Sequence, residues 1–388
     1  MLRAETLGWV LSAALIGATL ARAQSYVGDQ ACSTCHQEKS TAYHHTAHAK
    51  TSGRATKESI HGSFAAGANI LRTANPNLYF QMEARGAEFF QTGVLRTSPS
   101  EVLTRSERFD LVVGSGRKGQ TYLFWDGDGL FQLPVSYWTE LGSWVNSPGY
   151  VDGTANFDRP IPARCLECHG SSFESRAPPE NVYNKTSLVL GISCEKCHGP
   201  GGEHVARYRS ASPPRSGAET AIVNPAKLSR ERQMDSCSLC HAGAGHSLTP
   251  PLSFTPGQVL ANHVMFPKLP PDAPMDVHAS QVQLLERSRC FQASPTMTCT
   301  TCHDVHQPQR DPEILAAKCL TCHQVESCPT FPKLGQKIIS QCATCHMPLQ
   351  DTAQIIISVV NGKNLQPKVR NHHIAIYPGV QLPAAKAK

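Results

Sequence analysis

The sequence lacks the features that mark nucleic-acid-binding and membrane-spanning proteins. It contains no run of lysine and arginine of the type that contacts a phosphate backbone, although its formal net charge is +6. After residue 23 it contains no apolar run long enough to span a bilayer. We therefore expect no nucleic-acid partner, and no transmembrane segment in the chain that follows residue 23.

The first 23 residues have the pattern of an export signal. Arg3 provides a positive charge, residues 7–20 are mostly apolar, and Ala21, Arg22 and Ala23 form a small-residue cleavage site. No cysteine stands at the cleavage point, which argues against a lipoprotein. We expect cleavage after Ala23 and a periplasmic or extracellular location. An uncleaved membrane anchor is the alternative.

Seven copies of Cys-x-x-Cys-His are the main feature that is present. The two thiols of such a motif add to the two vinyl groups of a haem, and its histidine becomes the proximal iron ligand. A zinc site does not need a histidine after every second cysteine, and a disulfide scaffold does not repeat one spacing. The sequence therefore predicts seven covalently attached haem c groups. In chain order the motifs are motif 1 (Cys32, Cys35, His36), motif 2 (Cys165, Cys168, His169), motif 3 (Cys194, Cys197, His198), motif 4 (Cys237, Cys240, His241), motif 5 (Cys299, Cys302, His303), motif 6 (Cys319, Cys322, His323) and motif 7 (Cys342, Cys345, His346).

The histidines outside the motifs are candidates for the second axial ligand of each iron. Seven of the 18 histidines lie in motifs, which leaves eleven for seven distal positions. This surplus favours bis-histidine haems and electron transfer. The first candidates are His48, His204, His278, His306 and one of the pair His372 and His373. Further candidates are His61, His246 and His263. His44 and His45 are expected at the surface, or in contact with an iron ligand and not with the iron itself.

Two details refine these assignments. His306 follows His303 too closely to reach the opposite face of the same haem, so we expect it to bind the iron of a neighbouring haem. Methionine is an alternative distal ligand that would raise the reduction potential, and Met265 and Met275 lie in a suitable region.

Two cysteines, Cys290 and Cys328, belong to no motif. In an oxidising compartment an even remainder favours a disulfide. Such a bond would enclose the motifs that begin at Cys299 and Cys319. Two buried free thiols are the alternative.

The motifs are spaced unevenly, and this spacing suggests the domain organisation. Between motifs 1 and 2, alternating apolar segments predict short strands, with a hairpin turn at residues 126–129. We expect short α-helices around stacked c-type haems, an otherwise mostly irregular fold, and a helix near residues 278–288. With about 50 residues for each haem, much of the core is expected to be porphyrin, so the apoprotein should not fold. The expected units are the signal (1–23), a first haem segment (24–59), a small antiparallel β insertion (60–140), a six-haem domain (141–376) and a flexible tail (377–388).

The chain resembles the family of multihaem cytochromes that includes the tetrahaem electron acceptor of ammonia oxidisers. The resembling segments are residues 26–32, 194–204, 288–290, 298–306 and 345–348. Residues 109–113, 119–123 and 147–150, with Phe157 and Arg159, resemble a longer bacterial branch that carries a β insertion. The resemblance implies closely stacked haems and a periplasmic electron-transfer role. It also implies distal ligands at positions like His204, His278, His306 and the pair His372 and His373.

We interpret the protein as an exported electron conduit that exchanges electrons with redox partner proteins, and we assign no catalytic residue. One rival is an oxidoreductase that acts on a nitrogen or sulfur oxyanion at one open haem. We expect that haem to be the first, covered by the β insertion, with arginines nearby. The candidates are Arg72, Arg85, Arg105 and Arg117. Ammonia-forming nitrite reductases, which resemble this family, commonly use a Cys-x-x-Cys-Lys motif at the catalytic haem. The resemblance therefore implies that nitrite reduction is less favoured here, because the sequence contains no such motif. A second rival is a subunit of a conductive filament, or one that docks to an outer-membrane porin.

Overall fold

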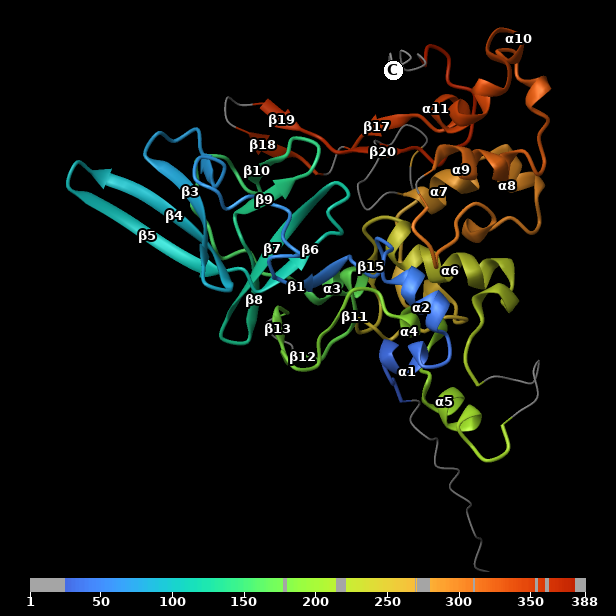
Figure 1. Ribbon diagram of the computed structural model, residues 1–388, viewed down its shortest axis with the longest axis horizontal. Coiled ribbons are helices and arrows are strands. Elements are labelled where there is room, and N and C mark those ends of the chain that lie inside the picture. The colour runs from blue at the N-terminus through green and yellow to red at the C-terminus, as the bar shows by residue number, and fades with distance from the viewer. Residues whose placement is uncertain are drawn as a thin grey trace, which may run out of the picture.

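The computed structural model describes residues 25–176, 180–213, 221–268, 270, 280–309, 311–352, 355–359 and 363–380. The expected export signal, His278, Met275 and the end of the expected tail (381–388) lie outside these residues. Figure 1 shows two regions side by side, a β region and a region of short helices that carries most of the motifs.

The β region is built around two antiparallel sheets. The larger has eight strands in the order β1-β6-β7-β8-β13-β12, with β9 paired to β7 and β10 paired to β9. Its strands are β1 (Ser52–Arg54), β6 (Leu111–Val113), β7 (Gly119–Asp126), β8 (Gly129–Gln132), β9 (Val135–Trp138), β10 (Ser143–Asn146), β12 (Ser175–Arg176) and β13 (Val182–Tyr183). The smaller sheet contains β2 (Ile70–Arg72), β3 (Leu78–Arg85), β4 (Glu88–Ser98) and β5 (Glu101–Arg108) in that order.

Alternating burial explains why these segments form strands. In β3 every second residue from Leu78 to Met82 is buried, the period expected of a strand with one covered face. The strands pack around a core of aromatic and aliphatic side chains that includes Phe80, Tyr122 and Phe124, each at most 1% exposed. The predicted turn is confirmed: Asp126 pairs with Gly129 across a two-residue loop that begins with a glycine at φ +55°.

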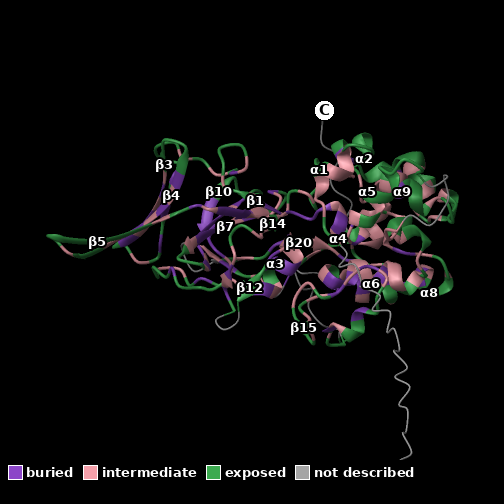
Figure 2. Cartoon of the chain, turned by 90° about the horizontal axis from the view of Figure 1, so that it is seen from below, coloured by how far each residue is buried: buried purple, intermediate pink, exposed green. Residues whose placement is uncertain are grey.

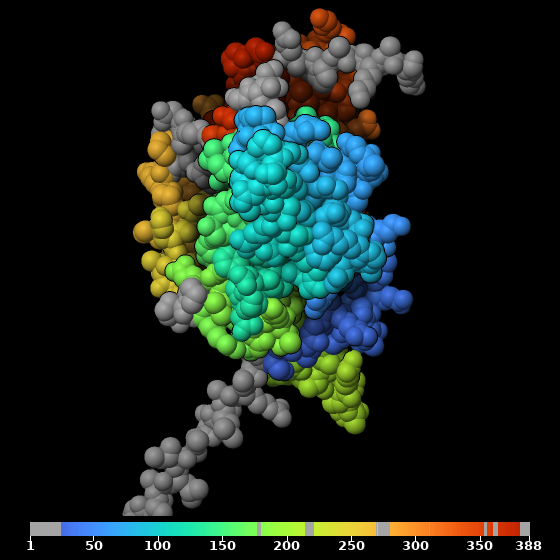
Figure 3. All heavy atoms as spheres, turned by 90° about the vertical axis from the view of Figure 1, so that its left-hand side faces the viewer, coloured from blue at the N-terminus to red at the C-terminus, as the bar shows by residue number. Residues whose placement is uncertain are grey.

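The larger sheet reaches further along the chain than the expected β insertion of residues 60–140. Strand β1 precedes that range, while β10, β12 and β13 follow it. In Figure 3 the strands of this region cover the end that faces the viewer, and the other segments lie behind and around them. The expectation of a mostly irregular chain was therefore wrong in degree, because segments on both sides of motif 2 complete the sheet.

Short helices carry or adjoin the motifs, as predicted. They are α1 (Asp29–Ser33), α2 (Gln37–Tyr43), α3 (Ala163–His169), α4 (Cys194–His198), α5 (Gly202–Tyr208), α6 (Arg230–His241), α7 (Gln281–Glu286), α8 (Arg289–Ala293), α9 (Pro312–Cys319), α10 (Phe331–Leu334) and α11 (Cys342–His346). Short 3-10 turns are η1 (Pro225–Lys227), η2 (Leu260–Asn262), η3 (Cys299–Thr301), η4 (Val325–Ser327) and η5 (Gly335–Gln341). The expected helix near residues 278–288 is confirmed as α7, with Val282 and Leu285 buried.

Four two-stranded sheets lie outside the two larger ones. They pair β11 (Gly170–Ser172) with β14 (Val189–Leu190), β15 (His246–Ser247) with β16 (Val264–Met265), β17 (Leu349–Asp351) with β20 (Lys368–Arg370), and β18 (Ile357–Val359) with β19 (Lys363–Leu365). Ile357 packs with Trp138 and Val145, so the C-terminal chain returns to the β region. No helix among the described residues is long and apolar enough to cross a membrane.

Candidate haem-binding site

Four motif histidines each face a histidine from outside the motifs. The ring centres are 6.0–6.3 Å apart. Two metal–imidazole bonds of about 2.0 Å, with roughly 1.1 Å from each bonded nitrogen to its ring centre, require about 6.2 Å. The ring spacing therefore fits one iron between the two rings of each pair. The pairs are His36 with His204, His198 with His306, His241 with His48, and His303 with His372.

The ring planes within these pairs differ in orientation. The interplanar angle is 20° for His36 and His204, and 25° for His198 and His306. It is 35° for His303 and His372 and 74° where His48 meets His241. The four sites are thus similar in spacing but not in ring orientation.

Three histidines from outside the motifs follow one motif closely in sequence but face the histidine of a different motif in space. His204 follows motif 3 and lies against His36 of motif 1. His306 follows motif 5 and lies against His198 of motif 3. The partner at motif 5 itself, His372, comes from near the C-terminus. The segments that carry the motifs are consequently interlocked.

The other candidate ligands lie elsewhere in the described structure. The His61 ring lies beside Gly116 in the β region, and His246 is exposed on β15. His263 places Nδ1 3.1 Å from the Thr249 hydroxyl. His373 faces Tyr377, with ring centres 6.4 Å apart. His44 and His45 are exposed, as is Met265.

Hydrogen bonds at Nδ1 orient several of the rings. The Nδ1 atoms of His198 and His346 are each 2.9 Å from a backbone oxygen, that of Val223 and that of Ala375. The Nδ1 of His372 is 3.0 Å from the Arg370 oxygen. A carbonyl only accepts, so Nδ1 carries the proton and Nε2 is left to bind a metal.

Burial keeps two of these imidazoles neutral. Burial, together with the nearby His48 ring, lowers the pKa of His241 to about 4. Burial also lowers the pKa of His372 to about 4. Because only the neutral ring binds iron, protons do not compete for these two positions near neutral pH.

Neighbouring motifs also contact one another through their attachment cysteines. Contact between the thiols of motifs 4 and 5 raises the pKa of Cys237 and lowers that of Cys299. Similar contact joins motifs 2 and 4, where Arg164 and the Cys168 thiol both donate to the Leu239 oxygen, at 2.8 and 3.7 Å. At motifs 1 and 3, the Cys194 amide donates to Asp29 over 2.9 Å.

The other neighbouring motifs are identified by the charges that act on their cysteines and on Lys196. Burial lowers the pKa of Lys196 in motif 3, while the thiols of Cys168 and Cys240 lie near enough to counter that shift. Burial and then the Cys302 thiol raise the pKa of Cys319, which relates motif 6 to motif 5. Burial and then the Cys319 thiol likewise raise the pKa of Cys342 in motif 7. The motifs thus follow the order 1, 3, then 2 and 4 together, 5, 6 and 7.

The expected disulfide between Cys290 and Cys328 is absent. Neither Cys290 nor Cys328 forms a disulfide in the structure. Cys290 lies near the thiols of Cys302 and Cys319, whereas Cys328 lies near Cys342. The prediction was wrong because Cys290 lies near motifs 5 and 6, whereas Cys328 lies near motif 7.

The β region contacts motif 2, whereas its covering of the first haem stays a prediction. Ala163 and Leu166 of α3, the helix of motif 2, pack with Leu111, Leu123 and Leu130 of the larger sheet. Figure 2 shows buried segments in this sheet and in α3. Two of the arginines proposed for an anion are paired with carboxylates, Arg85 with Glu83 at 2.7 Å and Arg105 with Glu107 at 2.9 Å.

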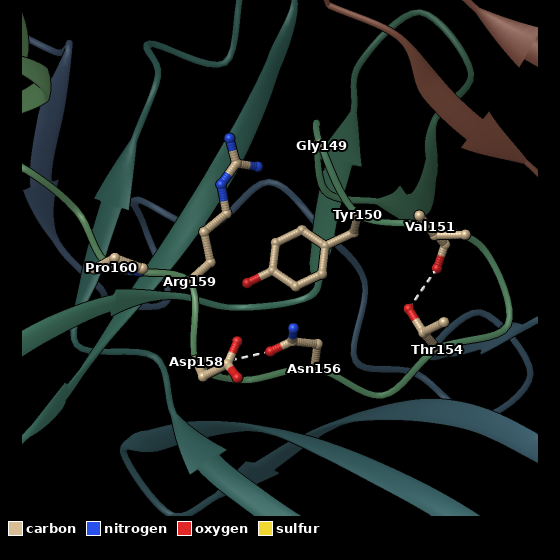
Figure 4. A pocket seen from close by; sticks show the side chains of 8 residues that line it. All are labelled: Gly149, Tyr150, Val151, Thr154, Asn156, Asp158, Arg159 and Pro160. Atoms are coloured by element: carbon tan, nitrogen blue, oxygen red, sulfur yellow. Dashed lines mark hydrogen bonds between the residues drawn. The ribbon is translucent and has the colours of Figure 1, made fainter.

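A surface cavity of about 450 Å³ lies in the loop between β10 and motif 2 (Figure 4). The Arg159 guanidinium lies 5.9 Å from the Tyr150 ring centre and donates to the Pro148 oxygen. The Tyr150 hydroxyl donates to the Gln132 oxygen over 2.6 Å. These polar groups bond to the protein itself, so we assign the cavity no ligand.

Glu195, inside motif 3, links the segment before motif 1 to the segment that carries motif 3 through hydrogen bonds of its side chain. Its carboxylate is buried and accepts backbone N–H groups of Val27, Gly28 and Gly201 at 2.8–2.9 Å. Glu195→Ala leaves three donors without this acceptor, and we expect a loss of about 3 kcal/mol or more in the free energy of unfolding. Urea denaturation followed by haem absorbance measures this loss.

The matched control for this clamp is Glu203→Ala. Glu203 lies on α5 and pairs with Arg207 at 2.5 Å, with both side chains nearly half exposed. Such a surface pair contributes at most about 1 kcal/mol. Equal urea midpoints for Glu195→Ala and Glu203→Ala would contradict the role of Glu195.

Sequence reasoning missed Glu195, and it also missed Thr51, whose hydroxyl lies 3.0 Å from Nδ1 of His169. Glu195 carried a usable signal, because a charged residue between two attachment cysteines must be paired or exposed. The backbone acceptors at Val223 and Ala375 carried none, because any residue type provides a carbonyl.

The comparisons with known proteins agree with these motifs. A family model described as cytochrome c554 and c-prime matches residues 150–199, which include motifs 2 and 3. None of the curated proteins matches the chain. The crystal structure of the outer cell wall cytochrome OcwA is similar, with a TM-score of 0.56, 17% identity, and coverage of 90% of this chain and 79% of that chain.

A second similar structure is an undecahaem cytochrome from the S-layer of Carboxydothermus ferrireducens, with a TM-score of 0.36 and 18% identity over 91% of this chain and 52% of that chain. The likeness to OcwA shows the fold, while the narrower resemblance to the protein of ammonia oxidisers stays a prediction. The seven motifs, the family match and the shared fold together support a multihaem c-type cytochrome with covalently bound haem c.

Proposed function

We propose that the chain is an exported electron-transfer protein that holds seven haem c groups, one at each motif, in one connected series. The observation that carries this proposal is the set of four histidine pairs spaced for iron, together with the proximity of neighbouring motifs. Bound haem supplies the iron that takes up and releases one electron. A continuous series favours passage through the chain over storage at one position.

The proposed distal ligands are those that face a motif histidine. They are His204 at motif 1, His306 at motif 3, His48 at motif 4 and His372 at motif 5. For motifs 2, 6 and 7 the remaining candidates stay predictions. They are His61, His246, His263, His278 and His373.

The protein's own residues would hold and tune the sites. Carbonyls at Val223 and Ala375 fix the proton on Nδ1 of two motif histidines. Burial keeps His241 and His372 neutral, which removes competition from protons. None of these roles requires acid–base chemistry.

We place the protein outside the cytoplasm, in the periplasm or at the cell exterior. The export-signal pattern of residues 1–23 supports this location. The names of the two similar structures, an outer cell wall cytochrome and an S-layer cytochrome, agree with it. Donor and acceptor would then be redox proteins or acceptors encountered there.

The proposal is tested by haem content and spin state. We expect mass spectrometry to give the mass of seven attached haems on each chain. We expect electron paramagnetic resonance of the oxidised protein to show low-spin signals for at least the four paired sites. Fewer than seven haems, or high-spin iron at most sites, would contradict the proposal.

A further inference from the structure

The histidine of motif 2 differs from two other motif histidines in what it meets at Nδ1. Backbone carbonyls lie against Nδ1 of His198 and His346. At His169, Nδ1 lies 3.0 Å from the Thr51 hydroxyl. A hydroxyl donates as well as accepts, and it is a weaker acceptor than an amide carbonyl.

The β region fixes this hydroxyl in place. The Gly114 amide donates to the Thr51 backbone oxygen over 2.7 Å, and the next residue, Ser52, pairs with Val113 in the larger sheet. The buried Ser52 hydroxyl donates to the His169 backbone oxygen and accepts the Gly191 amide at 2.9 Å. Strand β1 and the residue before it thus hold His169 at both its ring and its backbone.

The same turn of chain carries a proposed ligand of a neighbouring motif. His48 faces His241 of motif 4, and its backbone oxygen accepts the amides of Thr51 and Ile192 at 3.2 and 3.1 Å. Motifs 2 and 4 are in contact through Arg164, which donates to the Leu239 oxygen. The turn from His48 to Thr51 therefore contacts the histidines of two neighbouring motifs, 2 and 4.

We infer that Thr51 is a positioning residue that orients His169 and sets the reduction potential of the iron at motif 2. This inference rests on the proposed function, because it assumes that His169 binds haem iron through Nε2. An acceptor at Nδ1 increases electron donation from the ring to the metal, which favours the ferric state. The hydroxyl gives less of this effect than a carbonyl, so the motif 2 iron is easier to reduce than it would be with a carbonyl acceptor.

The test is a spectroelectrochemical titration of the holoprotein and of Thr51→Val, which has nearly the same shape but no acceptor. We expect one haem component of the seven to shift to a higher potential, by roughly threefold to tenfold in its reduction equilibrium, about 30 to 60 mV for one electron. Thr51→Ser keeps the hydroxyl and should return that component to the wild-type position. Thr51→Ala is measured as well, so that the result does not depend on one variant folding.

The matched control is Thr46→Val. Thr46 lies in the same turn, and its hydroxyl accepts the Ala49 amide at 3.3 Å. A wild-type titration curve for Thr51→Val and Thr51→Ala, or an equal shift in Thr46→Val, would overturn the inference. Failure of the proposed function would look different, because the wild-type protein itself would then lack seven redox-active haems.

Discussion

His306→Ala is expected to convert about one haem in seven from low to high spin, and the structure assigns that haem to motif 3 rather than to motif 5. The rings of His306 and His198 are 6.0 Å apart and only 25° from parallel. His303, three residues before His306, instead faces His372. Removing one imidazole from a six-coordinate iron leaves a weak or open position, which produces a high-spin signal in electron paramagnetic resonance.

A double variant tests the assignment to a particular motif. If His306 and His372 face different irons, His306→Ala combined with His372→Ala should give twice the high-spin signal of either single change. Added imidazole should restore the low-spin signal by filling the vacated positions. His44→Ala is the matched control, because His44 is exposed and faces no motif histidine in the described contacts. A fully low-spin His306→Ala protein would remove His306 from the proposed ligands.

The motifs could be predicted from the sequence because covalent chemistry sets their spacing. Two thiols must reach two vinyl groups of one haem, so the pattern at Cys194 or Cys342 is fixed within five residues. The strand near Phe80 was equally local, because burial on one face repeats every second residue from Leu78 to Met82.

The pairing of the histidines could not be predicted in the same way. His372 and His303 lie far apart in sequence, and no local pattern relates them. The sequence predicts His48, His204 and His306 as ligands, but the motif histidine that each one faces depends on how the segments interlock. The same reason explains the error at Cys290 and Cys328, where an even count was used to infer proximity.

The two halves of the molecule should respond differently to the loss of haem. The β region has its own side-chain core, in which Phe80, Met82, Tyr122 and Phe124 are at most 1% exposed. The motif region has small apolar clusters, such as that of Leu239, Phe254, Leu260 and Val264. The sequence alone predicts that the whole apoprotein does not fold, whereas the side-chain core of the β region leads us to expect this of the motif region alone.

We therefore expect the chain produced without haem attachment to keep the two sheets of the β region and to lose the helices around motifs 3 to 7. Burial of a large aromatic side chain contributes roughly 1.5–3 kcal/mol, and this core has several. The described residues of the motif region form only small apolar clusters, so we expect that region to need haem in order to fold. Hydrogen exchange measured by mass spectrometry should show protected amides in β3, β4 and β7 and fast exchange in α4, α6 and α11. The control is a Cys342→Ser, Cys345→Ser variant, which loses one haem and should lose protection only near motif 7. Uniform loss of protection across both regions of the apoprotein would show that the β region, too, needs haem to fold.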